Sequence, residues 1–309
     1  MAFAEAYLTY PDLFPARHAG EPWGELSLEL AFASERFRIE QLTADQAAAI
    51  REIFGEIEVT PSSHTPLRFR VYRSDPRDFV AGPWQWAYTF DLDHQADSVR
   101  LAGRGFLARF DRWPTPTASL WTATDDHGEF RGQFANVFRV VAAYRLLAAD
   151  AVLVHSAAFL DAGRVVMCIG HSGDGKTTIA SLAREAGLDI LSDDINALSQ
   201  LDDVAMVEKL PAAGDLGLLP GQPRPRPLAA LCRLIKGDHN SIAPIPRSTL
   251  LGLLVTCTPF VNADPHHNQR LLDLLPHLVR DVPTFALTFR RDGGFLPVLR
   301  AAIAQTDRS

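Results

Sequence analysis

A glycine-rich stretch, VVMCIGHSGDGKTT at residues 165–178, has residue types and spacing that could do chemistry. Within it, Gly170, Gly175, Lys176 and Thr177 satisfy the pattern G-x-x-x-x-G-K-[ST], between an apolar run and a helix-forming segment. Glycines let successive backbone N–H groups turn toward one point, and the start of the next helix adds partial positive charge. The stretch therefore predicts a phosphate-binding loop rather than a glycine turn with a solvated lysine. Lys176 would contact the β- and γ-phosphates of a nucleoside triphosphate, and the Thr177 hydroxyl would bind Mg²⁺.

Two adjacent acids follow this loop. Asp193 and Asp194 end the segment LDILSDD, beginning 17 residues after Lys176. If this segment is a strand beside the one that feeds the loop, its carboxyl end opens onto the phosphates. One carboxylate could then accept a proton from an attacking hydroxyl, and the other could hold the Mg²⁺ water shell. The alternative is a solvated strand end.

His155 lies one strand before the loop, in VLVHSAAF, and is a third candidate. A single histidine among apolar residues is often a core residue that bonds to the backbone, so its role depends on what surrounds it. We expect the remaining polar candidates to be solvated surface residues: Arg224, Arg226, His266, His267, Arg290 and Arg291. The alternatives are contact with an acidic peptide for the first two arginines and stabilisation of the transferring phosphoryl group for the last two.

The segments around these residues alternate between strand and helix. We expect strands at 152–160 and 164–170 joined by a turn at 161–163, a helix from 177 that ends at Gly187, and a strand at 188–194. Farther along, the patterns predict a proline-rich loop at 220–227, a helix at 268–282 and a hairpin at 283–295 with its turn at 292–294. Residues 247–257 fit either a helix or a buried strand.

The first half of the chain is rich in short alternating segments. These predict strands at 25–33, 37–42, 67–73, 87–93, 99–111 and 118–124. One helix is expected among them, with Thr43 as its N-cap and Gly55 as its stop. A second, amphipathic helix at 133–151 leads into the second half. We therefore predict an α/β protein with a β-rich region at 1–135 and a nucleotide-binding domain at 136–309.

Composition limits the classes of partner. The net charge is -7 and the basic residues are scattered, so we expect no nucleic-acid partner and no membrane association. No apolar run approaches the roughly 18 residues that span a bilayer, and the N-terminus does not resemble a signal peptide, so a cytoplasmic location is expected. Cys168, Cys232 and Cys257 lie in apolar segments without metal-ligand or disulfide spacing, which predicts buried free thiols.

The stretch LVHSAAFLDAGRVVMCIGHSGDGKTTIASLAREAGLDILSDDINAL, about residues 152–198, resembles the C-terminal domain of HPr kinase/phosphorylase and the smaller HPr-kinase-like proteins. It is also similar to the core of ATP-type phosphoenolpyruvate carboxykinase, whose loop likewise ends in Gly-Lys-Thr-Thr. The positions that match these families are His155, Gly170, Ser172, Gly173, Gly175, Lys176, Thr177, Asp193 and Asp194.

This resemblance implies roles for the matching residues. Asp193 would be the base that takes the hydroxyl proton, with Asp194 holding metal or positioning the nucleophile. Lys176 would neutralise phosphate, Thr177 would ligate Mg²⁺, and His155 would belong to the catalytic group. The predicted nucleotide-binding set is Gly170, Ser172, Gly173, Asp174, Gly175, Lys176, Thr177 and Thr178.

The resulting hypothesis is a kinase that transfers the γ-phosphoryl group of ATP to a hydroxyl, with serine of a protein or peptide as the first candidate. The β-rich region would help to position the acceptor, and the resemblance favours self-association into a homo-oligomer. Two alternatives stay open, a nucleotide-binding ATPase or switch and a kinase of small metabolites.

Overall fold

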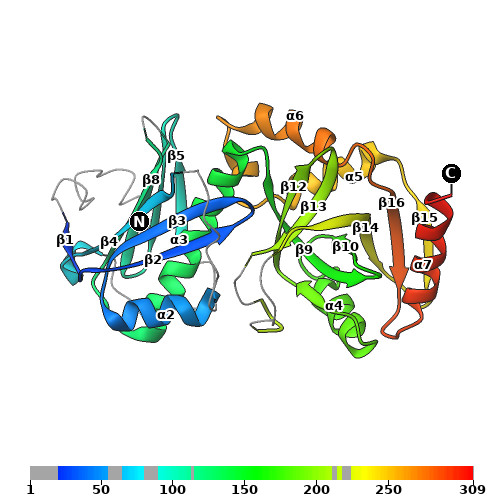
Figure 1. The fold of residues 1–309 in the computed structure, drawn as a ribbon, viewed down its shortest axis with the longest axis horizontal. Helices are drawn as coiled ribbons and strands as arrows, with labels where there is room; N and C mark the ends of the chain where they lie inside the picture. Colours follow the sequence, from blue (N-terminus) through cyan, green and yellow to red (C-terminus); the bar gives the residue numbers. More distant parts are fainter. Residues whose placement is uncertain are drawn as a thin grey trace. The chain divides into compact units, whose positions relative to one another are not determined.

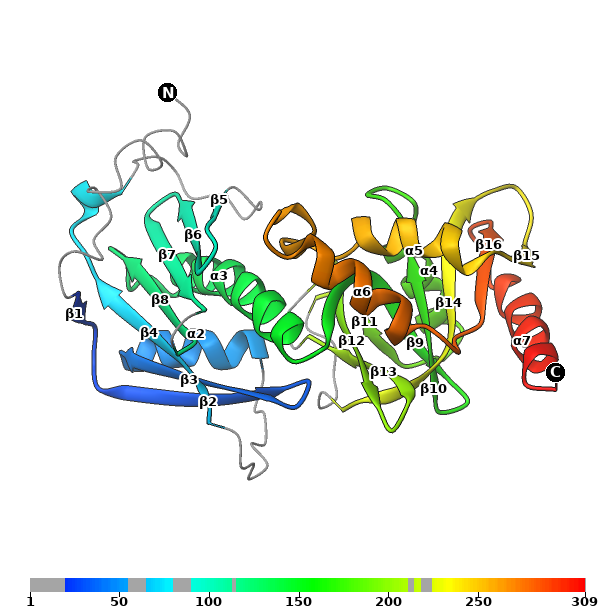
Figure 2. The same ribbon diagram turned by 90° about the horizontal axis from the view of Figure 1, so that it is seen from above.

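The structure is a computed structural model and describes residues 20–54, 65–79, 90–112, 115–210, 214–217 and 224–308. It is a mixed α/β fold with two sheets and, over these residues, six α-helices (Figures 1 and 2). The chain divides into two compact units, Met1–Ala142 and Ala143–Ser309. Both this division and the boundary expected at 135/136 lie within one helix, α3 (His127–Ala148).

The first unit is built on one mixed sheet. Its strands follow the order β2-β3-β4-β8-β7-β6-β5, and β1 pairs with β4. The elements that precede α3 are β1 (Glu21–Pro22), β2 (Leu26–Phe32), β3 (Glu35–Leu42), α2 (Ala44–Phe54), β4 (Leu67–Arg73), the 3-10 turn η3 (Pro76–Asp78), β5 (Phe90–His94), β6 (Ser98–Gly103), β7 (Phe106–Asp111) and β8 (Thr117–Thr122). The expected strands are confirmed over the described residues, while 87–89 of the strand expected at 87–93 lie outside them. The segment 99–111 is a hairpin, β6 and β7.

Helices α2 and α3 supply the core of this unit. Phe134 and Phe138 stand one turn apart on α3, where they meet Phe54 of α2 at ring-centroid distances of 6.0 and 4.8 Å. From the sheet, Phe37 contacts Phe138 and Phe69 contacts Phe134. The aromatic positions at helical spacing therefore identify the buried face, although α3 begins at His127, earlier than expected.

The expected cap of α2 is confirmed. The Thr43 hydroxyl accepts the Gln46 N–H at 3.1 Å, while the Gln46 side chain accepts the Thr43 N–H at 3.1 Å. This reciprocal pair satisfies two of the backbone donors that a helix start leaves free. Gly55, the expected stop, lies outside the described residues.

The second unit contains the glycine loop and the acid pair. Its elements are β9 (Val152–Asp161), β10 (Arg164–Ile169), α4 (Lys176–Glu185), β11 (Ile190–Ser192), β12 (Ile195–Leu201), β13 (Val204–Lys209), β14 (Arg226–Lys236), β15 (Ser241–Pro244), α5 (Arg247–Thr256), the 3-10 turn η4 (Val261–Ala263), α6 (Asn268–Leu278), β16 (Thr284–Phe289) and α7 (Phe295–Thr306). The sheet order is β10-β9-β12-β13-β14-β16-β15, and a further pairing of β10 with β14 joins the two arms of the sheet.

Helices α4 and α7 pack on the core of this sheet. Ile179 and Ala183 of α4 share one buried cluster with Phe159 of β9, and Phe295 of α7 meets Phe159 edge to face at 6.1 Å. Figure 1 shows α7 beside β15 and β16, and α5 next to α6. The glycine loop, which links β10 to α4, is therefore anchored at both ends by buried elements.

Three expectations for this unit need correction or refinement. The hairpin at 283–295 is wrong, because β16 is followed by helix α7. The Asp292 side chain accepts the Gly294 N–H at 2.9 Å, so the glycine turn starts a helix whose buried positions repeat at helical spacing. Arg226 and Pro227 belong to β14 rather than to a loop, and the segment expected as helix or strand forms helix α5, Arg247–Thr256.

The expected neighbours of the acid-bearing strand were also wrong. Strand β11 does not pair with β10, because β9 lies between them and pairs with both in antiparallel fashion. The parallel neighbour of β10 is β14. Strands β10 and β11 nevertheless run in the same direction, so their carboxyl ends emerge at the same edge of the sheet.

Candidate active site

The glycine loop has a backbone that requires glycine. Gly173 and Gly175 have φ of 86° and 103°, in the left-handed region that side chains disfavour. A Cβ on Gly175 would lie 2.8 Å from Cζ of Phe289, and a Cβ on Gly170 would lie 2.8 Å from Oδ2 of Asp174. That Asp174 oxygen accepts the His171 N–H at 2.7 Å. Asp174 therefore holds the shape of the loop from within.

Lys176 is the buried cation of the loop. Its side chain turns back so that Nζ donates to the carbonyl oxygens of Gly170 at 3.0 Å and His171 at 3.1 Å. Burial lowers the pKa of Lys176, while Coulombic interactions with Cys257, Asp174 and Asp194 oppose this shift. The loop thus holds a positive charge at its centre. The other predicted contact residues lie around it, with Ser172 exposed and Thr178 half-buried in the first turn of α4.

Strand β9 sets the distance between the loop and the acid pair. Its Ser156 pairs with Ile169, the last residue before the loop, and its Ala158 pairs with Ser192, the last residue before the acids. On the other side of the acid pair, Ile195 pairs with His155. One strand, β9, therefore brings His155, the loop and the acids to the same part of the sheet.

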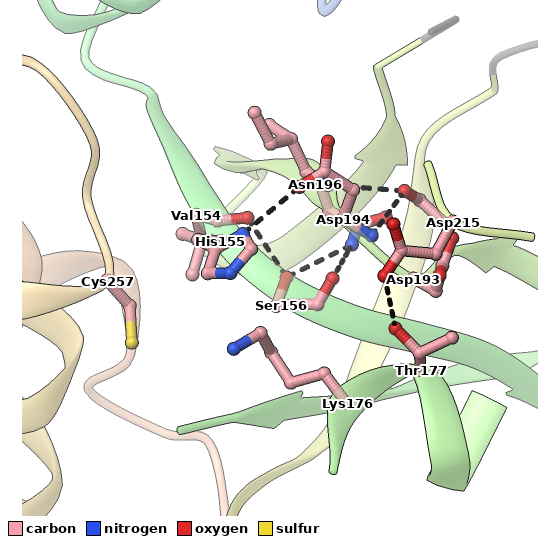
Figure 3. A network of polar contacts seen from close by, with 12 residues as sticks. Val154, His155, Ser156, Lys176, Thr177, Asp193, Asp194, Asn196, Asp215 and Cys257 are labelled. Carbon is pink, nitrogen blue, oxygen red and sulfur yellow. Dashed lines mark hydrogen bonds and ion pairs between the residues drawn. The ribbon is translucent and has the colours of Figure 1, made fainter. Parts of the chain in front are cut away.

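The side chains of Asp194 and His155 lie against each other. Nδ1 of His155 lies 3.2 Å from Oδ1 of Asp194, and their side chains are 40% and 20% exposed (Figure 3). The surrounding backbone is fixed: the Ser156 N–H donates to the Asp194 carbonyl at 2.9 Å, and the His155 N–H donates to the Cys257 carbonyl at 2.7 Å. This pair is the part of the acid site that a molecule from solution can reach.

Asp193 is in a different environment, because the residue is only 3% exposed. Burial raises its pKa, and repulsion by Asp215 adds to this, while hydrogen bonding from the Leu216 N–H and the Thr177 side chain opposes it. The Thr177 hydroxyl has one proton, and the geometry directs it to Oδ2 of Asp215 at 3.2 Å. Oδ2 of Asp193 is then left without a hydrogen-bond partner among the described residues.

Several residues of the site were not predicted. Asn196 donates from Nδ2 to both the carbonyl and the hydroxyl of Ser156, each at 3.0 Å, which ties β12 to β9 behind the acids. Cys257 lies near the loop, with Sγ 3.7 Å from the Gly170 carbonyl, and burial raises the pKa of its thiol. Asn196 follows the acids closely and could have been suspected. Asp215 and Cys257 belong to no motif, so only the fold reveals them.

The weaker candidates have other partners. Arg290 pairs with Asp292, and the His266 N–H donates to Asp264 at 2.8 Å. Arg224 and Arg226 are exposed. Within the described part of the chain, no group of three or more His, Cys, Asp or Glu could hold a metal ion. The three cysteines are free and buried, as expected. No helix in the described ranges has the length and apolarity needed to cross a membrane.

Comparisons with known proteins add little. No family model and no curated protein match the chain. Among solved structures, an HPr(Ser) kinase/phosphatase from Coxiella burnetii is matched with 13% sequence identity and a TM-score of 0.29, over 50% of this chain and 95% of that chain. A likeness this distant carries no argument about activity, so the proposed function depends on the geometry of the site.

Proposed function

We propose that the second unit is an ATP-dependent kinase that transfers the γ-phosphoryl group to a hydroxyl, with serine of a protein or peptide as the preferred acceptor. One observation carries this proposal. Lys176, buried in the glycine loop, lies close enough to Asp194 for the two charges to interact, and Asp194 in turn contacts His155. Phosphoryl transfer needs a positive charge at the phosphates next to a group that can accept a proton.

The loop fits a triphosphate. Two glycines in left-handed conformation and the start of α4 provide backbone donors and partial positive charge, and Lys176 can exchange its two loop carbonyls for phosphate oxygens. Mg²⁺ would neutralise charge on the phosphates, and the residues present fit it, because the Thr177 hydroxyl and the unpartnered oxygen of Asp193 are the hard oxygen ligands that this ion prefers.

The geometry favours a different division of roles between the acids from the one that the sequence suggested. Asp193 is buried near Thr177, so we assign it to the metal. Asp194 is reachable from solution and paired with His155, so we assign it as the base. The acceptor oxygen bonds to the γ-phosphorus while the bond to the bridging oxygen of ADP breaks, and the hydroxyl proton passes to Asp194.

Binding and transfer are measured separately to test this proposal. Lys176→Ala should weaken ATP binding, measured by calorimetry, because it removes the charge at the centre of the loop. Asp194→Asn should retain ATP binding and lower transfer to a serine-containing protein or peptide acceptor by about 10²–10⁴-fold, the usual contribution of a positioned base. The matched control is Asp189→Asn, an exposed residue just before β11, which should change neither.

Other outcomes would contradict the proposal. Release of phosphate at a rate that no acceptor changes would favour an ATPase or switch. Transfer only to small hydroxyl compounds would favour a metabolite kinase. If Asp194→Asn kept full transfer while Asp193→Asn abolished it without loss of metal binding, the base would be Asp193.

A further inference from the structure

Three oxygen-bearing side chains from separate segments meet beside the first turn of α4. Thr177 comes from that turn, Asp193 directly follows β11, and Asp215 comes from the short segment 214–217 (Figure 3). Oδ2 of Asp215 is 3.2 Å from the Thr177 hydroxyl, and Asp193 is close enough to both for each to influence its pKa. The proposed transfer does not use Asp215.

A tight turn holds Asp215 in this position. The Gly217 N–H donates to the Gly214 carbonyl at 3.0 Å, and Gly217 has a φ of 79°. Gly214 lies directly against the acid pair, because a Cβ there would be 2.3 Å from Oδ1 of Asp193. The Leu216 N–H, at 3.4 Å, faces that same oxygen, and the Leu216 side chain packs on the core of the unit. The turn is therefore built onto Asp193 and presents Asp215 to Thr177.

Without a ligand, this arrangement of carboxylates lowers the free energy of unfolding. Two carboxylates repel each other there, and Oδ2 of Asp193 is buried with no partner in the described part of the chain. Burying a charged oxygen without compensation is unfavourable, whereas a cation between the carboxylates would satisfy both. Asp215 is exposed, so one of the two carboxylates is accessible to ions from solvent.

We propose that Asp193, Asp215 and the Thr177 hydroxyl form a divalent-cation site that the protein supplies before any nucleotide binds. The donors are all oxygens, which selects a small hard cation such as Mg²⁺ or Mn²⁺ over Zn²⁺. Three protein donors leave the other coordination positions of the cation to water or phosphate. This agrees with the finding that, among the described residues, no three or more His, Cys, Asp or Glu side chains gather as metal ligands. The inference extends the proposed function by adding Asp215, but it does not require phosphoryl transfer.

Binding of Mn²⁺ alone, followed by the loss of the free-ion signal in electron paramagnetic resonance, tests this site. The full chain without nucleotide should bind about one Mn²⁺, and added Mg²⁺ should release it. Asp193→Asn and Asp215→Asn should each weaken binding by at least about tenfold, as expected when a coordinating group is lost. Asp189→Asn removes the same charge from an exposed position and should bind as the wild type does.

The outcomes that overturn the inference are clear. Wild-type protein that binds no Mn²⁺ without nucleotide, or an Asp215→Asn variant that binds it as tightly as the wild type, would remove Asp215 from the site. Equal weakening by Asp189→Asn would indicate scattered surface carboxylates. Far-UV circular dichroism shows that each variant is folded. Because ATP is absent, a chain that binds Mn²⁺ but transfers no phosphate would retain this site and lose only the kinase proposal.

Discussion

Asp193 shows how a single buried carboxylate can oppose stability and favour ligand binding. Its pKa is raised because burial penalises the charged form. A raised pKa in the folded state means that the native protein binds the proton more tightly than the unfolded chain does. Ionised Asp193 therefore lowers the free energy of unfolding at pH values above its folded pKa, and this penalty disappears below the ordinary pKa of 3.8.

Replacing Asp193 by asparagine should therefore stabilise the ligand-free protein at pH 7. The amide has no charge to desolvate and can donate toward Asp215. We expect Asp193→Asn to unfold at a higher temperature than the wild type, with the difference shrinking as the pH falls toward 4. Calorimetry across this range measures the effect, and the exposed control Asp189→Asn should stay within about 0.5 kcal/mol of the wild type. A less stable Asp193→Asn variant at pH 7 would mean that a partner compensates the charge.

The glycine loop positions chemistry through backbone conformation, and its glycines are not equivalent. Both Gly173 and Gly175 have positive φ, but a Cβ on Gly173 meets nothing within 4 Å. On Gly175, the added carbon would press on Phe289, which is only 3% exposed and cannot move away. One position is thus constrained by conformation alone, the other by conformation and packing.

Alanine at the two positions should separate these effects. Gly173→Ala should cost about 1 kcal/mol of the free energy of unfolding, from the left-handed conformation. Gly175→Ala should cost roughly 1–3 kcal/mol more, because overpacking adds to the strain. Denaturation followed by far-UV circular dichroism measures the difference. Equal losses would show that Phe289 or the loop relaxes freely.

The elements of the site were predictable to different degrees. Local patterns identified β9, β10, α4 and the order of the chemical residues, because glycine spacing and apolar periodicity act over short distances. They failed where a neighbour was decided by tertiary pairing: β9, not β11, lies beside β10. They failed again at residues 292–294, since two glycines fit a hairpin turn as well as the start of α7. Asp215 lies in GDLG, whose pattern only indicates a turn.

The whole chain offers a natural probe for one unit. All tryptophans fall within Met1–Ala142, so intrinsic fluorescence follows the first unit, while the proposed nucleotide and cation sites are in the second. These residues are Trp23, Trp84, Trp86, Trp113 and Trp121. Each unit has its own sheet, and the residues of helix α3 are divided between the two units.

A cap substitution in the first unit tests whether the two units unfold separately. Thr43→Ala removes the hydroxyl that accepts the Gln46 N–H and should cost about 1 kcal/mol. The urea concentration at the midpoint of unfolding, measured by tryptophan fluorescence, should fall. The increase in stability that Mn²⁺ produces, measured by circular dichroism, should be the same as in the wild type. Thr43→Ser keeps the cap and should behave nearly as the wild type does. A fall in both signals together would show that unfolding is one cooperative event.

The role of β9 has a consequence for changes in chain length. Since its residues 155–158 pair with the segments on both sides, a single-residue insertion there would turn His155 to the opposite side of the sheet and shift the loop relative to the carboxylates. The turn at Asp202 and Asp203, between β12 and β13, carries none of this pairing and should accept extra residues. Natural or engineered variants that lengthen this unit are therefore expected to differ at that turn and to keep β9 at constant length.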